Sequence, residues 1–201
     1  MLSGKGGPQY AKCVSPIVID TDGTGFGITD AEHGVQFDFY GDGPPVRIAW
    51  TKPGSANGWL CLPNKLGIVE SGRQLFGDIT PQPKTSNPNG FAALAVYDTA
   101  HKGYIDESNP IYDTLRVWID RNHNGISEPE ELFALRSLGI RTIDLHYASD
   151  SVELESGALF RYKGDITDFL GFHDGKTIYD VWLPYLAPPA AKVQQDGRVR
   201  R

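Results

Sequence analysis

The chain has 201 residues and a formal net charge of −6 at neutral pH, a size that suits one domain or two small ones. Hydrophobic residues make up 40% of the chain, which excludes a disordered protein, and the acidic balance argues against a nucleic-acid-binding protein. No apolar run is long enough for a membrane span, and the opening residues show no signal peptide. The 23 glycines and 14 prolines predict many turns between short elements.

Short apolar or alternating runs, separated by Gly, Pro and Asn turns, predict strands along most of the chain. In chain order these runs are residues 15–20, 35–39, 46–50, 59–62, 115–119, 142–145, 159–162 and 179–183. Residues 89–97 have a helical composition. Residues 128–139 favour a second helix, with acids in the first turn, Pro129 at the first helical position and Gly139 at the end. We therefore expect a β-rich α+β fold, a single domain of short strands with one or two short helices.

The predicted domain covers residues 15–186, with a flexible arm at residues 1–14 and a flexible basic tail at residues 187–201. Its acidity is concentrated in one segment. Between Asp98 and Glu131 eight acids face three bases, so this segment carries −5 of the net charge of −6. Clustered carboxylates repel one another, and a bound cation relieves that repulsion.

Residues 120–131, with the sequence DRNHNGISEPEE, fit the calcium-loop pattern of an EF-hand. Calcium takes oxygen ligands, about six to eight of them. The pattern assigns this role to Asp120, Asn122, Asn124, the Ile126 carbonyl, Glu128 (directly or through water) and a bidentate Glu131. Gly125 permits the sharp turn at the sixth position. The simpler alternative is an Asn-Gly turn that caps a helix, with Glu128 and Glu130 beside the helix dipole.

Two features depart from an ordinary EF-hand. The segment before Asp120 is strand-like, so we expect no entering helix. Ser127 stands at the eighth position, where an apolar residue is usual, which argues against pairing with a partner loop. Residues 98–109 form a weaker copy of the pattern, in which Ala100 and Lys102 occupy the third and fifth positions. Because an ammonium opposes cation binding, we expect a vestigial loop that keeps only its turn geometry.

An Asp-Thr-Asp-Gly-Thr run begins at Asp20, directly after an apolar strand. One interpretation is a second metal site, formed by Asp20, Asp22 and Thr24 together with Asp38 or Asp42. A second is plain turn chemistry. A third is a magnesium-dependent phosphatase, because the run looks like the first motif of haloacid-dehalogenase-type enzymes, with Asp20 as nucleophile and Asp22 as acid and base. Cys13 and Cys61 form either one disulfide, if the protein is exported, or two buried thiols.

The chain resembles secreted bacterial calcium-binding proteins of the hemolysin type (RTX-associated), whose accessory regions carry D-x-N-x-D-G loops. The resemblance is strongest over residues 89–145, in the stretches 115–120, 120–131 and 135–140, and it extends back to residues 15–23, 37–43 and 75–78. It implies a secreted protein that binds Ca²⁺, and it does not imply a catalytic activity. Family members tend to have a further calcium loop before Leu-Phe-Gly-Asp. Here Leu62 and Leu66 replace its carboxylates, so we expect residues 62–70 to be metal-free.

Two interpretations of the biological role remain open. In the first, the protein is a calcium-binding module with a structural or adhesive role. In the second, the domain binds another protein or a glycan, and calcium only stabilises its fold. The sequence does not choose between these interpretations.

Overall fold

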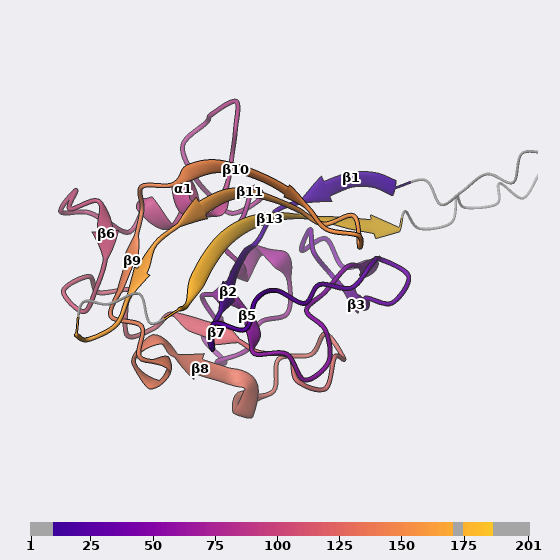
Figure 1. Cartoon of the computed structure of the whole chain (residues 1–201), viewed down its shortest axis with the longest axis horizontal. Coiled ribbons are helices and arrows are strands. Elements are labelled where there is room, and N and C mark those ends of the chain that lie inside the picture. The colour runs from indigo at the N-terminus through magenta and orange to yellow at the C-terminus, as the bar shows by residue number, and fades with distance from the viewer. Residues whose placement is uncertain (1–9, 171–174, 187–201) are drawn as a thin grey trace, which may run out of the picture.

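The computed structural model describes residues 10–170 and 175–186 (Figure 1). Within this part the regular structure consists of thirteen strands, one α-helix and three short 3-10 turns. The expected α+β class is therefore wrong, and the domain is mostly β. The predicted tail at residues 187–201 and the first nine residues of the predicted arm lie outside the described residues.

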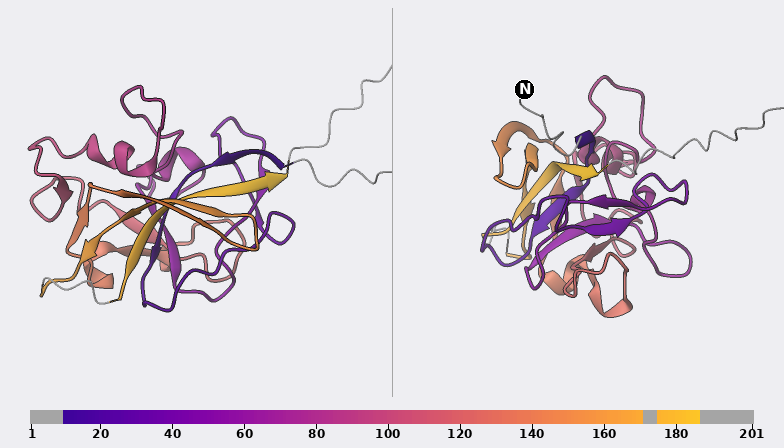
Figure 2. Two further views of the ribbon diagram at one scale, coloured as in Figure 1. Left: turned by 45° about the horizontal axis from the view of Figure 1, so that its top comes forward. Right: turned by 90° about the vertical axis from the view of Figure 1, so that its right-hand side faces the viewer.

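The larger sheet is antiparallel throughout and curls like half of a barrel (Figures 1 and 2). Its main path runs β10-β11-β13-β2-β5-β7-β8, while β1 and β4 also pair with β13, and β3 pairs with β4. The strands are β1 (Tyr10–Val14), β2 (Ile17–Asp20), β3 (Val35–Phe37), β4 (Val46–Ile48), β5 (Asn57–Cys61), β7 (Arg116–Trp118), β8 (Leu132–Ala134), β10 (Ala148–Glu153), β11 (Leu159–Gly164) and β13 (Thr177–Leu186). The long strand β13 therefore joins the two halves of the sheet.

A second, three-stranded sheet has the order β12-β9-β6 and lies beside the helix α1 (Figure 1). Its strands are β6 (Tyr104–Ile105), β9 (Thr142–Asp144) and β12 (Ile166–Thr167), and α1 spans Gly90–Ala95. The helical composition of residues 89–97 is thus confirmed. Asn89 caps α1, because its side chain accepts a hydrogen bond from the backbone N–H of Ala92.

Both faces are buried at the centre of the larger sheet, where every residue of β2 and β5 is buried. On β2, the Val18 side chain packs on one face, and those of Ile17 and Ile19 pack on the other. The first face contains Trp50, Trp59 and Trp118, which are fully buried and packed ring against ring.

Two expected elements differ from the structure. The helix expected at residues 128–139 is a 3-10 turn (Pro129–Glu131), strand β8 and a second 3-10 turn (Leu135–Leu138). The middle of this segment is a strand because Leu132–Ala134 pairs with β7. Pro129 does open a turn, and Gly139 ends the second one at φ 71°. Within the arm expected at residues 1–14, Tyr10–Val14 forms the strand β1.

Candidate functional site

Residues 120–131 connect two neighbouring antiparallel strands, β7 and β8. We call this segment the Asp120 loop. The chain leaves β7 at Trp118 and returns through a 3-10 turn at Glu131, and the Ile119 N–H donates to the Glu131 carbonyl at 2.9 Å. A strand stands where an EF-hand has its entering helix, as expected.

The Asp120 carboxylate is buried at the centre of its loop, with 2% of the residue exposed. Its Oδ1 accepts the N–H of Asn124 at 3.1 Å, and its Oδ2 accepts the N–H of Gly125 at 2.8 Å. Gly125 has φ 72°, the left-handed conformation that its position in the turn requires. A third donor comes from the core, because the indole Nε1 of Trp50 lies 2.8 Å from Oδ2.

Glu131 closes the loop and is also buried, with 6% of the residue exposed. Its Oε1 accepts the N–H of Arg121 at 2.9 Å, and its Oε2 accepts the indole Nε1 of Trp118 at 3.3 Å. The first and last residues of the loop are therefore both held by tryptophans of the core.

Glu128 lies between these ends. Its Oε1 accepts the side-chain amides of Asn124 at 2.8 Å and Asn122 at 3.4 Å. Its Oε2 is buried and has no hydrogen-bond partner. The Asn124 amide is the main cause that lowers the pKa of Glu128, and the neighbouring Glu131 side chain also lowers it. Burial is the main cause that raises the pKa of Glu131, and Glu128 and the charge of Asp120 raise it further.

Three carboxyl groups thus lie near one another without a compensating base. In the described part of the chain, none of Asp120, Glu128 and Glu131 forms an ion pair with a Lys, Arg or His side chain. Across the same residues, no group of three or more His, Cys, Asp or Glu side chains is arranged as a finished metal site. The loop therefore has the oxygen donors of a cation site, but they do not yet surround one point.

Two further positions of the loop face away from its centre. The Ile126 side chain is 63% exposed, and its N–H donates to Asn124 Oδ1 at 2.7 Å. The Ser127 hydroxyl accepts the Val69 N–H at 2.7 Å and donates to the Val69 carbonyl at 3.0 Å. The eighth position therefore does pair with another segment, residues 62–70. The pairing uses the Ser127 hydroxyl and not its backbone groups.

Three other loops, which begin at Asp20, Asp38 and Asp98, close in the same way as the Asp120 loop. In each, the first aspartate accepts the N–H of a glycine five residues later, and that glycine has a positive φ. The pairs are Asp20–Gly25 at 2.8 Å, Asp38–Gly43 at 2.9 Å, Asp98–Gly103 at 2.7 Å and Asp120–Gly125 at 2.8 Å. The four loops differ at the twelfth position, which is occupied by Ala31, Ala49, Asn109 and Glu131 respectively. Among these four loops, the Asp120 loop alone has a carboxylate side chain at its twelfth position.

The structure places the residues of the possible second site in two separate loops. Asp22 Oδ1 accepts the N–H of Thr24 at 3.1 Å, within the loop that follows β2. Asp38 and Asp42 belong to the loop after β3, where the Asp38 carbonyl accepts the Gly72 N–H at 3.1 Å. Asp20, the expected phosphatase nucleophile, is buried, and burial is the main cause that raises its pKa. Both Asp20 oxygens accept backbone N–H groups, from Gly23 at 3.1 Å and from Gly25 at 2.8 Å.

Cys61 is a free, fully buried thiol in β5, and this burial raises its pKa. The side chain of Cys13 lies outside the described residues.

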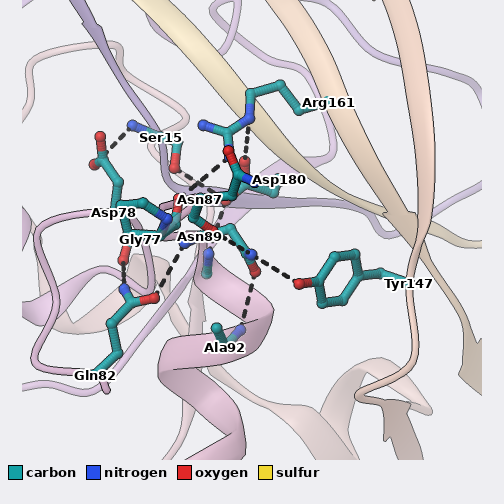
Figure 3. A network of polar contacts seen from close by, with 12 residues as sticks. Ser15, Gly77, Asp78, Gln82, Asn87, Asn89, Ala92, Tyr147, Arg161 and Asp180 are labelled. Atoms are coloured by element: carbon teal, nitrogen blue, oxygen red, sulfur yellow. Dashed lines mark hydrogen bonds and ion pairs between the residues drawn. The ribbon is translucent and has the colours of Figure 1, made fainter. Parts of the chain in front are cut away.

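A second polar cluster joins β13, β11 and the start of α1 (Figure 3). Asp180, on β13, is fully buried, and its Oδ2 accepts the Ser15 hydroxyl at 3.0 Å and the Gly90 N–H at 2.8 Å. Arg161 lies on the other side, with Nε 3.5 Å from Asp180 Oδ1. Asn89 donates to the hydroxyl of Tyr147 at 3.0 Å. Because these contacts link elements far apart in the sequence, we assign this cluster a structural role.

Sequence reasoning missed the contribution of Trp50, Trp118 and Ser127 to the loop. Both tryptophans are fully buried in the core, but nothing in the sequence shows that their N–H groups point at Asp120 and Glu131. The only available signal for Ser127 is that a hydroxyl replaces an apolar residue in an otherwise regular pattern.

No helix among the described residues is long and apolar enough to cross a membrane. The chain is similar to the iron-regulated protein FrpA of Neisseria meningitidis serogroup C, with 34% identity over 157 residues. This match covers 76% of the chain but 14% of FrpA, so the chain spans about one seventh of the length of this relative. Residues 17–184, which include the Asp120 loop and nearly all of the larger sheet, match the SPM domain. The chain therefore belongs to the SPM domain family.

Proposed function

We propose that this chain is a calcium-binding module in which the Asp120 loop holds one Ca²⁺ and the ion stabilises the fold. The ligands are the side-chain oxygens of Asp120, Asn122, Asn124, Glu128 and Glu131, together with the Ile126 carbonyl. The observation that carries the proposal is the Glu128 carboxylate, which has one buried oxygen without a partner beside a second buried acid, Glu131.

Electrostatics supports a cation at this point. The carboxyl groups of Glu128 and Glu131 interact with each other and lie near a third, that of Asp120. Among the described residues no base forms an ion pair with any of them. Placing like charges together away from water is costly, and a divalent cation removes that cost. Calcium also prefers oxygen donors in a flexible arrangement, which side-chain amides, carboxylates and a carbonyl provide.

Binding requires a local rearrangement. Because the donors do not yet surround one point, the Glu128 and Glu131 carboxyl groups must separate and turn towards Asp120. The two asparagine amides must then present oxygen to the ion, since Asn124 Oδ1 accepts the Ile126 N–H and both amide nitrogens donate to Glu128. A site of three carboxylates that must reorganise should bind with a dissociation constant on the order of 10⁻⁵–10⁻³ M.

A calorimetric titration with CaCl₂ tests the proposal. We expect one site in the wild type and no measurable binding in Glu131→Gln. The matched control is Glu130→Gln, which makes the same chemical change one residue away on an exposed side chain, and should bind as the wild type does. Absence of binding in the wild type, or equal binding in Glu131→Gln, contradicts the proposal.

The setting of the module is also a proposal. The resemblance to secreted hemolysin-type proteins and the much greater length of FrpA both support an extracellular module of a larger protein, with a structural or adhesive role towards another protein or a glycan. Millimolar calcium outside cells would keep a site of this affinity filled. Detection of the natural full-length protein in the culture medium, and not only in the cell fraction, tests this setting.

A further inference from the structure

The loop at residues 98–109, which we call the Asp98 loop, follows nearly the same backbone course as the Asp120 loop at its start. Its first residue bonds the N–H of Gly103, as Asp120 bonds that of Gly125. The fourth residue of each loop is a histidine with positive φ, 53° at His101 and 58° at His123. Left-handed residues other than glycine are uncommon, so this shared detail indicates the same local architecture.

The loops differ at the fifth position, where the Asp98 loop has Lys102. Its ammonium Nζ lies 2.5 Å from Asp106 Oδ1 and 2.6 Å from Ser108 Oγ. It also lies 4.5 Å from the centroid of the Tyr104 ring. These three residues occupy the seventh, ninth and eleventh positions of the loop, so the ammonium turns back into the loop instead of extending into water. Its side chain is only 22% exposed.

The charges around Lys102 show what this ammonium does. Asp98 is 5% exposed, and its Oδ1 is buried without a hydrogen-bond partner. Burial by itself would raise the pKa of Asp98, but the N–H groups of Gly103 and Lys102, the Asn109 side chain and the Lys102 charge together lower it. Burial opposes ionisation of Asp106 too, and the hydrogen bond from Lys102 is the largest contribution that lowers the pKa of Asp106. The Lys102 ammonium therefore favours the ionised form of both carboxylates, chiefly that of Asp106, while the Gly103 N–H contributes most at Asp98.

We propose that the Lys102 ammonium is the built-in cation of the Asp98 loop and does there what a metal ion would do in a loop of this shape. A lysine ammonium is a compact charge with three donors, so it can neutralise several oxygens at once. The loop is consequently folded without metal. Since the Gly103 carbonyl accepts the Leu145 N–H beside β9, the smaller sheet is held independently of calcium.

Three variants of the full chain test this proposal. Lys102→Met keeps the aliphatic chain but removes the charge, and should lower the melting temperature in chelator by several degrees. Lys102→Arg keeps the charge and should melt close to the wild type. Lys102→Asp exchanges the cation for a ligand, and its calcium stoichiometry should rise by one above the wild-type value, whatever that value is. If Lys102→Asp unfolds in chelator, recovery of the native circular dichroism spectrum on adding calcium shows the same new site.

Terbium luminescence locates the new site. Tyr104 is the seventh residue of the loop, so Tb³⁺ bound in Lys102→Asp should luminesce on excitation of tyrosine, and the added signal should be absent in the Lys102→Asp, Tyr104→Phe double variant. An unchanged melting temperature in Lys102→Met, or an unchanged calcium count in Lys102→Asp, overturns the proposal. Both outcomes are independent of the Asp120 loop, whose failure would appear as a wild-type count of zero.

Discussion

The indole Nε1 of Trp50 donates a 2.8 Å hydrogen bond to Oδ2 of Asp120, and this contact joins the core of the sheet to the first residue of the Asp120 loop. Trp118, whose ring centroid lies 5.4 Å from that of Trp50, makes the corresponding contact with Glu131. Both ends of the loop therefore rest on one packed pair of rings. A substitution in the loop should therefore alter the stability of the core, and a substitution in the core should alter the geometry of the loop.

The first prediction concerns Trp50→Phe. This change removes a hydrogen bond to a buried carboxylate, and such bonds contribute about 1.5–3 kcal/mol. We expect the free energy of unfolding to fall by at least that amount, because the smaller ring also leaves space in the core. Calcium affinity should fall as well, since Asp120 loses a contact that orients it. Urea denaturation with and without calcium measures both effects.

Trp59→Phe is the matched control for this change. Trp59 packs 4.8 Å from Trp50 and is as fully buried, but its Nε1 has no hydrogen-bond partner. Its replacement should cost packing only and leave calcium affinity unchanged. If Trp59→Phe weakens calcium binding as much as Trp50→Phe, the indole N–H groups do not orient the loop.

The second prediction concerns Ser127→Ala. The hydroxyl satisfies both backbone groups of Val69, which is buried, so its removal leaves a buried N–H and a buried carbonyl without partners. An unsatisfied buried group costs about 1–3 kcal/mol. Because two such groups are left, we expect a loss of stability of about 2–6 kcal/mol, measured by chemical denaturation. Ser137→Ala, which removes an exposed hydroxyl that bonds the Ala134 carbonyl, should cost less than half as much.

The third prediction concerns removal of calcium. A ligand that binds only the folded state stabilises it by RT ln(1 + [L]/Kd), about 2.7 kcal/mol at a hundredfold excess over Kd. For a chain of this size, that free energy raises the melting temperature by roughly 5–10 °C. We expect this difference between 10 mM calcium and excess chelator, and none in Asp120→Ala. An equal rise in Asp120→Ala would place the ion elsewhere in the chain.

The strands of this fold are predictable because alternation and β-branched runs follow directly from burial on a pleated sheet. The helix expected at residues 128–139 does not form, and residues 132–138 show why the local pattern is ambiguous there. Leu132, Leu135 and Leu138 are spaced by three, which fits one face of an α-helix but also the three-residue period of a 3-10 turn. The decisive fact is the pairing of Leu132–Ala134 with β7, a contact between chain segments that local pattern does not contain.

The candidate site likewise has features that the local sequence predicts and features that depend on contacts between distant segments. The order of oxygen donors from Asp120 to Glu131 is local, so the pattern identifies it. The hydroxyl bridge from Ser127 to Val69 spans 58 residues of sequence, and the indole contact from Trp50 to Asp120 spans 70. Such contacts depend on the completed fold. Lys102 is intermediate: its position opposes metal binding on sequence alone, but only the structure shows the ammonium turned inward onto Asp106.

The fourth prediction concerns pH and Asp180. Burial is the main cause that raises the pKa of Asp180 to about 6 from an ordinary value of 3.8. Between these values the unfolded chain has lost this proton while the folded chain still holds it. The folded state then binds more protons, so the contribution of Asp180 to the free energy of unfolding falls as pH rises through this window. Below pH 3.8 both states are protonated, and the contribution is constant.

Asp180→Asn removes this titration while keeping an oxygen that can accept the Gly90 N–H and the Ser15 hydroxyl. The free energy of unfolding of the wild type, minus that of the variant, should therefore decrease between pH 4 and pH 6, by at most about 1.4 kcal/mol per pH unit. Urea denaturation at fixed ionic strength measures this difference. A difference for Asp180→Asn that is flat, or that rises with pH, would mean that Asp180 is already ionised in the folded protein through its contact with Arg161.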